Sequence, residues 1–129
     1  MTHVVKTTKS MEQAARDVEA ALGRRRFSVL WALDVNETLA AKGLDLHGGH
    51  FRILEVCSAA RAKEVLETNP LVSNLLPCKV TLHETAAGTE IGMPLPTALM
   101  AALGDPRLQP LAEEVERAML EAIDEAARS

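Results

Sequence analysis

The spacing of apolar residues predicts a strand and then a helix at the beginning of the chain. Residues 3–8 are rich in Val and Thr, a composition typical of a strand. Ser10 and Gln13 have the spacing of a capping box, and apolar residues then recur every three or four positions as far as Leu22. Gly23 is placed to end that helix.

Large apolar side chains occupy every second position of residues 27–35, which predicts a second strand with these side chains on one common face. Leu30 and Ala32 keep the other face apolar as well, so we expect that face to be partly covered. Asn36 has a side chain suited to cap a short helix over residues 37–42.

The middle of the chain predicts a strand, a helix and a β-hairpin in succession. The apolar run 51–57 is a strand, and Ser58 can cap a helix over 59–68. Residues 78–85 and 89–93 flank a short Gly-containing segment, which is the composition of a hairpin.

The most regular pattern lies near the C-terminus. Pro96 suits the first turn of a helix that ends near Gly104, and Asp105-Pro106 has the composition of a helix start. From there apolar residues recur at helical spacing, and most charged residues lie away from them. The apolar stripe consists of Leu108, Leu111, Val115, Met119, Ala122, Ile123 and Ala126.

The order of these elements predicts a single domain over residues 1–129, of the α/β (α+β) class. We expect a two-layer sandwich in which helices, including the C-terminal amphipathic helix, pack on a mixed β-sheet. The connection from Cys57 to Cys78 contains a helix, which suits a right-handed crossover between parallel strands. Those cysteines would then be separated by roughly 20 Å, too far for a disulfide. Antiparallel pairing of the two strands would remove that separation.

Composition narrows the class of protein. The formal net charge is −4 and the only basic cluster is Arg24-Arg25-Arg26, so we expect no nucleic-acid partner. That cluster suits the C-terminal end of a helix, where cations complement the dipole. No apolar run approaches the ~20 residues that span a bilayer, and the N-terminus lacks the pattern of a signal peptide. Two cysteines without paired spacing suit a reducing compartment, so we expect a cytoplasmic protein with no membrane partner and no cofactor.

Cys57 and Ser58 stand where a strand gives way to a helix, which makes them candidate site residues. A helix N-terminus offers free N–H groups and a positive dipole, so a small anionic ligand could bind at Ser58 and Arg61. The same dipole favours a reactive thiolate at Cys57, and Cys78 could be exposed and activated beside Lys79. The structural alternative for both cysteines is burial, because free cysteines are among the most buried residue types.

The remaining candidates are acidic residues and histidines. Glu55 lies in an apolar strand, where it could act as a general base or pair with a cation across the sheet or a dimer interface. Asp45, His47 and His50 share a Gly-containing loop and offer oxygen and imidazole ligands to a divalent metal. No helix or strand fixes that spacing, so a solvated loop is the alternative.

Residues 53–58 form an apolar strand that ends in Cys-Ser, and the chain continues after a helix as Leu76-Pro77-Cys78-Lys79-Val80. Together with Trp31-Ala32-Leu33-Asp34, this pattern resembles the domain-of-unknown-function 302 family, loosely over the whole chain. The resemblance implies a small mixed α/β sandwich, a homodimer and no established activity. The chain departs from the family pattern at Ser58-Ala59, where Asn-Pro is usual, and at Val35, where His is common. The resemblance therefore gives no support to a site built from that Asn or that His.

Two classes of function remain open. The first is a homodimeric binding or accessory protein, because the motifs assemble no nucleophile, base and orienting group and the second faces of the strands are apolar. The second is a thiol-dependent enzyme, or a sulfur or redox carrier, that uses Cys57 or Cys78. Metal binding through His47 and His50 is a third hypothesis.

Overall fold

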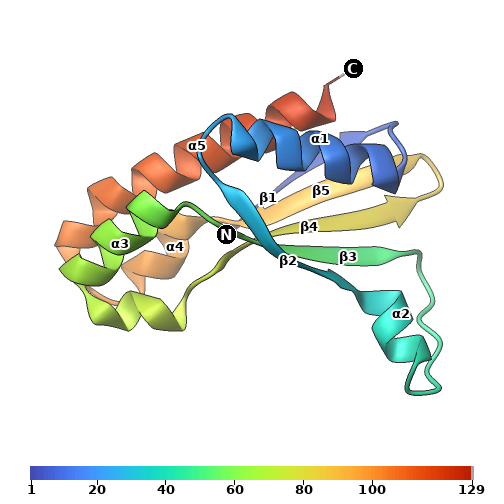
Figure 1. The fold of residues 1–129 in the computed structure, drawn as a ribbon, viewed down its shortest axis with the longest axis horizontal. Helices are drawn as coiled ribbons and strands as arrows, with labels where there is room; N and C mark the ends of the chain where they lie inside the picture. Colours follow the sequence, from blue (N-terminus) through green and yellow to red (C-terminus); the bar gives the residue numbers. More distant parts are fainter. Residues whose placement is uncertain (129) are drawn as a thin grey trace.

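The computed structural model describes residues 1–128 as a two-layer α+β fold (Figure 1). The strands are β1 (Thr2–Thr7), β2 (Ser28–Asp34), β3 (Phe51–Cys57), β4 (Cys78–Thr85) and β5 (Gly88–Pro94). The helices are α1 (Met11–Gly23), α2 (Val35–Ala40), α3 (Ala59–Thr68), α4 (Pro96–Ala101) and α5 (Gln109–Ala127), with 3-10 turns η1 (Pro70–Asn74) and η2 (Pro106–Leu108). The predicted α+β class, with helices packed on a sheet and an amphipathic C-terminal helix, is confirmed.

The sheet has the strand order β1-β5-β4-β3-β2, and every neighbouring pair is antiparallel. The prediction of a mixed sheet with a parallel crossover between β3 and β4 is therefore wrong. The intervening α3 and η1 lie beyond the end of the sheet and bury Val65 and Val72 in a cluster of their own. Because these helices do not cross the sheet, the chain returns to β4 at the end where β3 stops (Figure 1).

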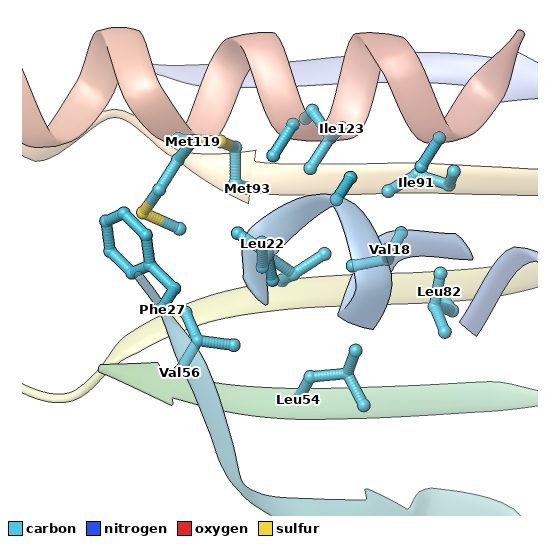
Figure 2. Packing of buried hydrophobic residues seen from close by; sticks show 14 of the residues in the cluster. Val18, Leu22, Phe27, Leu54, Val56, Leu82, Ile91, Met93, Met119 and Ile123 are labelled. Atoms are coloured by element: carbon cyan, nitrogen blue, oxygen red, sulfur yellow. The ribbon is translucent and has the colours of Figure 1, made fainter. Parts of the chain in front are cut away.

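The main core lies between the sheet and the helices α1 and α5 (Figure 2). Val18 and Leu22 of α1 and Met119 and Ile123 of α5 are all at most 1% exposed. Alternate residues of each strand meet them, because successive side chains of a strand point to opposite faces. Burying an apolar side chain of this size contributes roughly 1.5–3 kcal/mol. The strand residues of this core are Leu54, Val56, Val80, Leu82, Ile91 and Met93.

A second, smaller cluster lies beyond the end of the sheet at which β3 ends and β4 begins. It joins α3, η1, α4 and α5, and the turn η2 closes it. The buried members are Val65, Val72, Met100, Leu108 and Ala112. The cluster holds these elements against the end of the sheet that carries the two cysteines.

A bulge at Leu30 changes the face to which the residues of β2 point. Val29 pairs with Val56 and packs against the main core, whereas Trp31 pairs with Glu55. Strict alternation would place Val29 and Trp31 on one face, as predicted, but the extra residue of the bulge separates them. The indole of Trp31 therefore leaves the core, and the residue is 52% exposed.

The face of the sheet opposite to α1 and α5 stays open in the described part of the chain (Figure 1). Cross-strand pairing places five residues side by side on this open face: Leu33, Ile53, Thr81, Gly92 and Val4. A Cβ atom added to Gly92 would meet both Thr81 Oγ1 and Val4 Cγ2, so these residues share one face. We call this set the apolar row.

Polar and aromatic pairs lie on either side of the apolar row. Trp31 pairs with Glu55, and Glu55 pairs with Lys79. On the other side, the rings of Phe51 and His83 stack with their centroids 4.1 Å apart. The open face therefore carries Leu33, Ile53 and Val4 along the apolar row, with charged residues on both sides of it: Glu55 and Lys79 on one side, and Lys6 and Glu90 on the other.

The short helix α2 projects beyond the sheet at the end of β2, and none of its residues is buried (Figure 1). Asp34 caps it, because its carboxylate accepts the N–H of Glu37 at 3.0 Å, so the predicted cap at Asn36 is wrong. Asn36 instead donates to the carbonyl of Gly49 at 3.0 Å and accepts the N–H of Phe51 at 2.8 Å. Asp34 and Asn36 both carry a side-chain oxygen that can cap a helix. Asp34, at the end of β2, is the one whose oxygen reaches the free N–H group of Glu37.

Candidate functional site

The two cysteines lie close together at the end of the sheet where β3 stops and β4 starts. Val56 is the residue paired with Cys78, so Cys57 lies one residue beyond that pair. Both cysteines are free and partly buried, and both line one cavity of about 20 Å³ that we call the thiol cavity. The predicted strand-length separation is therefore wrong, because it rested on parallel strands.

Cys78 does not have the properties of an activated thiol. Burial raises the pKa of the Cys78 thiol to about 11, and the nearby Cys57 adds to the rise while Lys79 opposes it. Cys78 also packs against the main core. A thiol with this pKa is protonated at neutral pH and is a poor nucleophile. These properties favour the structural alternative for Cys78.

Ser58 and Arg61 form part of a local network at the start of α3. Ser58 is buried, but its hydroxyl does not cap the helix and instead accepts from Arg61 Nη1 at 3.3 Å. Arg61 also donates to the carbonyl of Arg25 at 2.8 Å and to Glu114 Oε1 at 3.2 Å. Its guanidinium carbon lies 5.0 Å from the centre of the Phe27 ring. An anion at Ser58 and Arg61 would have to compete with Glu114, and the anion site remains a prediction.

Glu55 lies on the open face and has a cationic neighbour across the sheet. Its Oε1 atom is 3.5 Å from Nζ of Lys79 on β4. This is the pairing that the sequence offered as the alternative to a general base. Because Trp31 lies on the other side of Glu55, the carboxylate stands between an aromatic and a cationic side chain.

The candidate metal ligands of the loop do not converge. Asp45 and His47 are 3.8 Å apart, and their side chains are 88% and 89% exposed. His50 points elsewhere, since its Nε2 atom lies 2.9 Å from Oδ1 of Asp34. Within residues 1–128, no three His, Cys, Asp or Glu side chains come together so as to hold a metal ion.

Sequence reasoning missed Asp34 as the partner of His50. The N–H of Glu37 and the imidazole of His50 both bind its carboxylate, and the two hydrogen bonds lower the pKa of Asp34, the first more strongly. The available signal was an acidic residue at the end of a strand. Pairing it with His50, sixteen residues away, required the strand register.

The basic cluster has a structural role at the end of α1. Arg24 and Arg25 both pair with Glu125 of α5, and they lower the pKa of that carboxyl. Arg25 also donates to the carbonyl of Ala21 at 2.9 Å, where a cation complements the helix dipole. The cluster thus joins the two helices that cover the core.

These features define a two-layer α+β protein with an antiparallel sheet, one open sheet face and two free thiols at one end of the sheet. The chain belongs to the family described as "Domain of unknown function DUF302", whose sequence model matches residues 3–126. The resemblance seen in the sequence is thereby confirmed. The function of this family is unknown.

A solved structure has nearly the same fold. It is described as the crystal structure of uncharacterized conserved protein DUF302 from Bacillus stearothermophilus, and it is 35% identical over 98% of each chain with a TM-score of 0.93. No curated protein matches the chain. Along residues 1–128, none of the helices combines the length and the apolar composition needed to cross a membrane.

Proposed function

We propose that this protein is a homodimeric binding or accessory protein whose two copies meet through the open faces of their sheets. The observation that carries the proposal is the apolar row, which runs across the face that α1 and α5 leave open. Contiguous apolar surface on a folded domain marks an interaction site. Burial of this face against a second copy would remove it from water.

The exposed residues at both edges of the sheet support this proposal. Val4 on β1 is 53% exposed and Trp31 on β2 is 52% exposed. Leu33, on the same strand as Trp31, and Ile53, on the neighbouring β3, share this face and are half-buried. A large aromatic residue beside aliphatic residues is the composition of an interface centre, where most binding energy is concentrated.

The charges on the open face suit a second copy of the chain. Glu55 and Lys79 lie side by side, so a two-fold axis can set the carboxylate of one copy against the ammonium group of the other. The helix α2 is a second argument. It has no buried residue of its own and stands beyond the sheet, where a partner sheet can cover it.

Native mass spectrometry and light scattering of the untagged protein test the proposal. We expect a dimer for the wild type and a monomer for Trp31→Glu, because an unpaired charge in an apolar interface is strongly unfavourable. Leu71→Glu is the matched control, since Leu71 is 56% exposed but lies on η1, away from the open face. A monomeric wild type, or a Trp31→Glu dimer as tight as the wild type, contradicts the proposal.

The thiol-dependent alternative has less support, because the Cys78 thiol is protonated at neutral pH. The two free cysteines do support a reducing compartment such as the cytoplasm. A mass above that of the bare dimer would indicate a retained ligand. Its loss in Cys57→Ser would direct the search to the thiol cavity.

A further inference from the structure

The strand β2 forms one edge of the sheet, and its outer side is free. It pairs with β3 alone in the strand order β1-β5-β4-β3-β2 (Figure 1). Such an edge presents unpaired backbone N–H and C=O groups to any strand that lies beside it. Within residues 1–128, no other strand pairs with this side of β2.

The composition of β2 favours pairing with another strand. Residues 29–33 are all apolar, and Leu30 and Trp31 are 60% and 52% exposed. Edge strands commonly carry a lysine or a proline that discourages such pairing, and β2 contains neither. The strand at the opposite edge, β1, does contain Lys6. The edge at β2 is therefore the one suited to receive a strand.

A broad hollow beside β2 leaves room for an incoming strand. Its volume is about 540 Å³, and it lies between residues 31–34 of β2 and one side of α2. The bonds that Asp34 and Asn36 make hold α2 in this position. The hollow is thus part of the fold of a single chain. The residues of α2 and of the turn after it that line the hollow are Glu37, Thr38, Ala41 and Lys42.

Two exposed and oppositely charged side chains flank β2. Arg26 precedes the strand, and Glu37 follows it in the first turn of α2. Within residues 1–128, neither side chain takes part in an ion pair or a hydrogen bond. Arg24 and Arg25, by contrast, both pair with Glu125. An unpaired cation therefore stands at the start of β2 and an unpaired carboxylate at its end.

We infer that β2 pairs edge to edge with β2 of a second copy of the chain, antiparallel and about a two-fold axis near Trp31. The start of each strand then lies beside the end of the other, so Ser28 of each copy stands near Asp34 of the other. Arg26, two residues before Ser28, comes level with the first turn of the other α2, which contains Glu37. The unpaired charges of both copies are thereby matched.

The charges favour a second copy of this chain over an unrelated strand. A two-fold contact is self-complementary, so each charge must meet its opposite at the other end of the same segment. Arg26 and Glu37 meet this condition, because they have opposite signs and lie on opposite sides of Trp31 at comparable sequence distances. Like charges at both ends would instead repel an antiparallel copy.

This contact does not rest on the proposed dimer interface, because it uses the edge of the sheet and not its open face. It is also weaker. The bulge at Leu30 interrupts regular hydrogen bonding near the two-fold axis, and exposed ion pairs contribute little to affinity. We therefore expect the edge contact only at higher protein concentration, where it joins the dimers that the open face forms.

Sedimentation velocity of the untagged full-length protein over a range of concentrations tests the inference. We expect the mass of the wild type to rise with concentration above that of its dilute form. Arg26→Glu and Glu37→Arg each set like charges together at both ends of the pair, so each should raise the required concentration by about tenfold or more. An equimolar mixture of the two variants restores both ion pairs and should assemble like the wild type.

Lys63→Glu is the matched control, since Lys63 is an exposed cation on α3, away from β2, and should not change the assembly. Circular dichroism establishes that each variant is folded. A wild-type mass that does not rise with concentration overturns the inference, and so does a mixture that assembles no better than its separate components. The dilute wild type reports on the open face instead. A monomer there contradicts the proposed function, while a mass that then rises with concentration and is restored in the mixture still supports the edge contact.

Discussion

His50 lies 2.9 Å from Asp34, measured between Nε2 and Oδ1, and this contact closes the segment that carries α2. Asp34 ends β2 and caps α2, while His50 immediately precedes β3. The two residues therefore hold together the ends of a projection that has no buried residues of its own. A histidine that the sequence offered as a metal ligand instead fixes the geometry of this loop.

Replacing His50 by Ala should loosen the loop and lower stability slightly. The contact is partly exposed, and such pairs contribute about 0–1 kcal/mol, so we expect a loss of at most about 1 kcal/mol. Denaturant unfolding measures the loss, and amide hydrogen exchange over residues 41–49 should become faster. His47→Ala is the control, because that side chain is 89% exposed and should leave both measurements unchanged. Equal effects of the two substitutions would contradict this role for His50.

The contact between Lys9 and Asp17 should make stability depend on acid pH. Lys9 Nζ donates to Asp17 Oδ2 at 2.7 Å and to the carbonyl of Ala126 at 2.7 Å. The hydrogen bonds from Lys9 and Gln13 lower the pKa of Asp17 in the folded protein. The unfolded chain therefore takes up a proton first as the pH falls through the ordinary pKa of about 3.9, and this contribution to stability is lost below it.

Asp17→Asn removes that titrating group and checks this origin of the acid sensitivity. We expect its free energy of unfolding to vary less between pH 5 and pH 2 than that of the wild type. Urea unfolding at a series of pH values gives both curves. Parallel curves would show that other carboxylates, such as Asp34 and Glu125, account for the whole dependence.

The sequence predicts the elements that are determined by local residue spacing. It does not predict arrangements that depend on contacts between residues far apart in the chain. The stripe of α5 and the hairpin of β4 and β5 are set by spacing alone, and both lie where predicted. The direction of β3 relative to β4 depends on where α3 packs. That packing is decided by a second cluster around Val65 and Met100, which no local spacing predicts.

The same difference between local and distant determinants applies to the candidate site. The positions of Cys57 at a strand end and Cys78 at a strand start follow from the sequence, but their proximity requires antiparallel pairing. Trp31 is exposed because of the bulge at Leu30. The alternating apolar pattern does not predict this bulge, since it indicates a regular strand through Leu30. Met100 in the thiol cavity depends on α4, which is far from both cysteines in the chain.

Cys78 should resist modification and should make stability fall at alkaline pH. Because the pKa of its folded thiol is raised to about 11, the unfolded thiol ionises first, near pH 8.5. Stability from this group is complete below about pH 8.5 and is lost as the pH rises toward the folded value, by up to about 3 kcal/mol. Cys78→Ala should flatten this dependence.

Thiol alkylation at pH 8 followed by peptide mass spectrometry checks the same property directly. Cys78 should react slowly in the native protein, because its thiol is protonated at this pH, and rapidly in denaturant. Fast alkylation of native Cys78 would show that the thiol is accessible and that burial does not control its pKa.

Gly88 should be far less replaceable than Gly104, another glycine with positive φ, because its backbone lies against a neighbouring strand. Its φ is 141°, and a Cβ atom there would overlap the carbonyl oxygen of Thr7 at the end of β1. Gly104 also has a positive φ, 68°, but a Cβ atom there meets nothing within 4 Å. Gly104→Ala therefore isolates the backbone strain, about 1–2 kcal/mol, while Gly88→Ala adds the overlap and should cost roughly 3 kcal/mol or more. Denaturant unfolding compares the two variants, and equal losses would mean that β1 moves away from the hairpin at little cost.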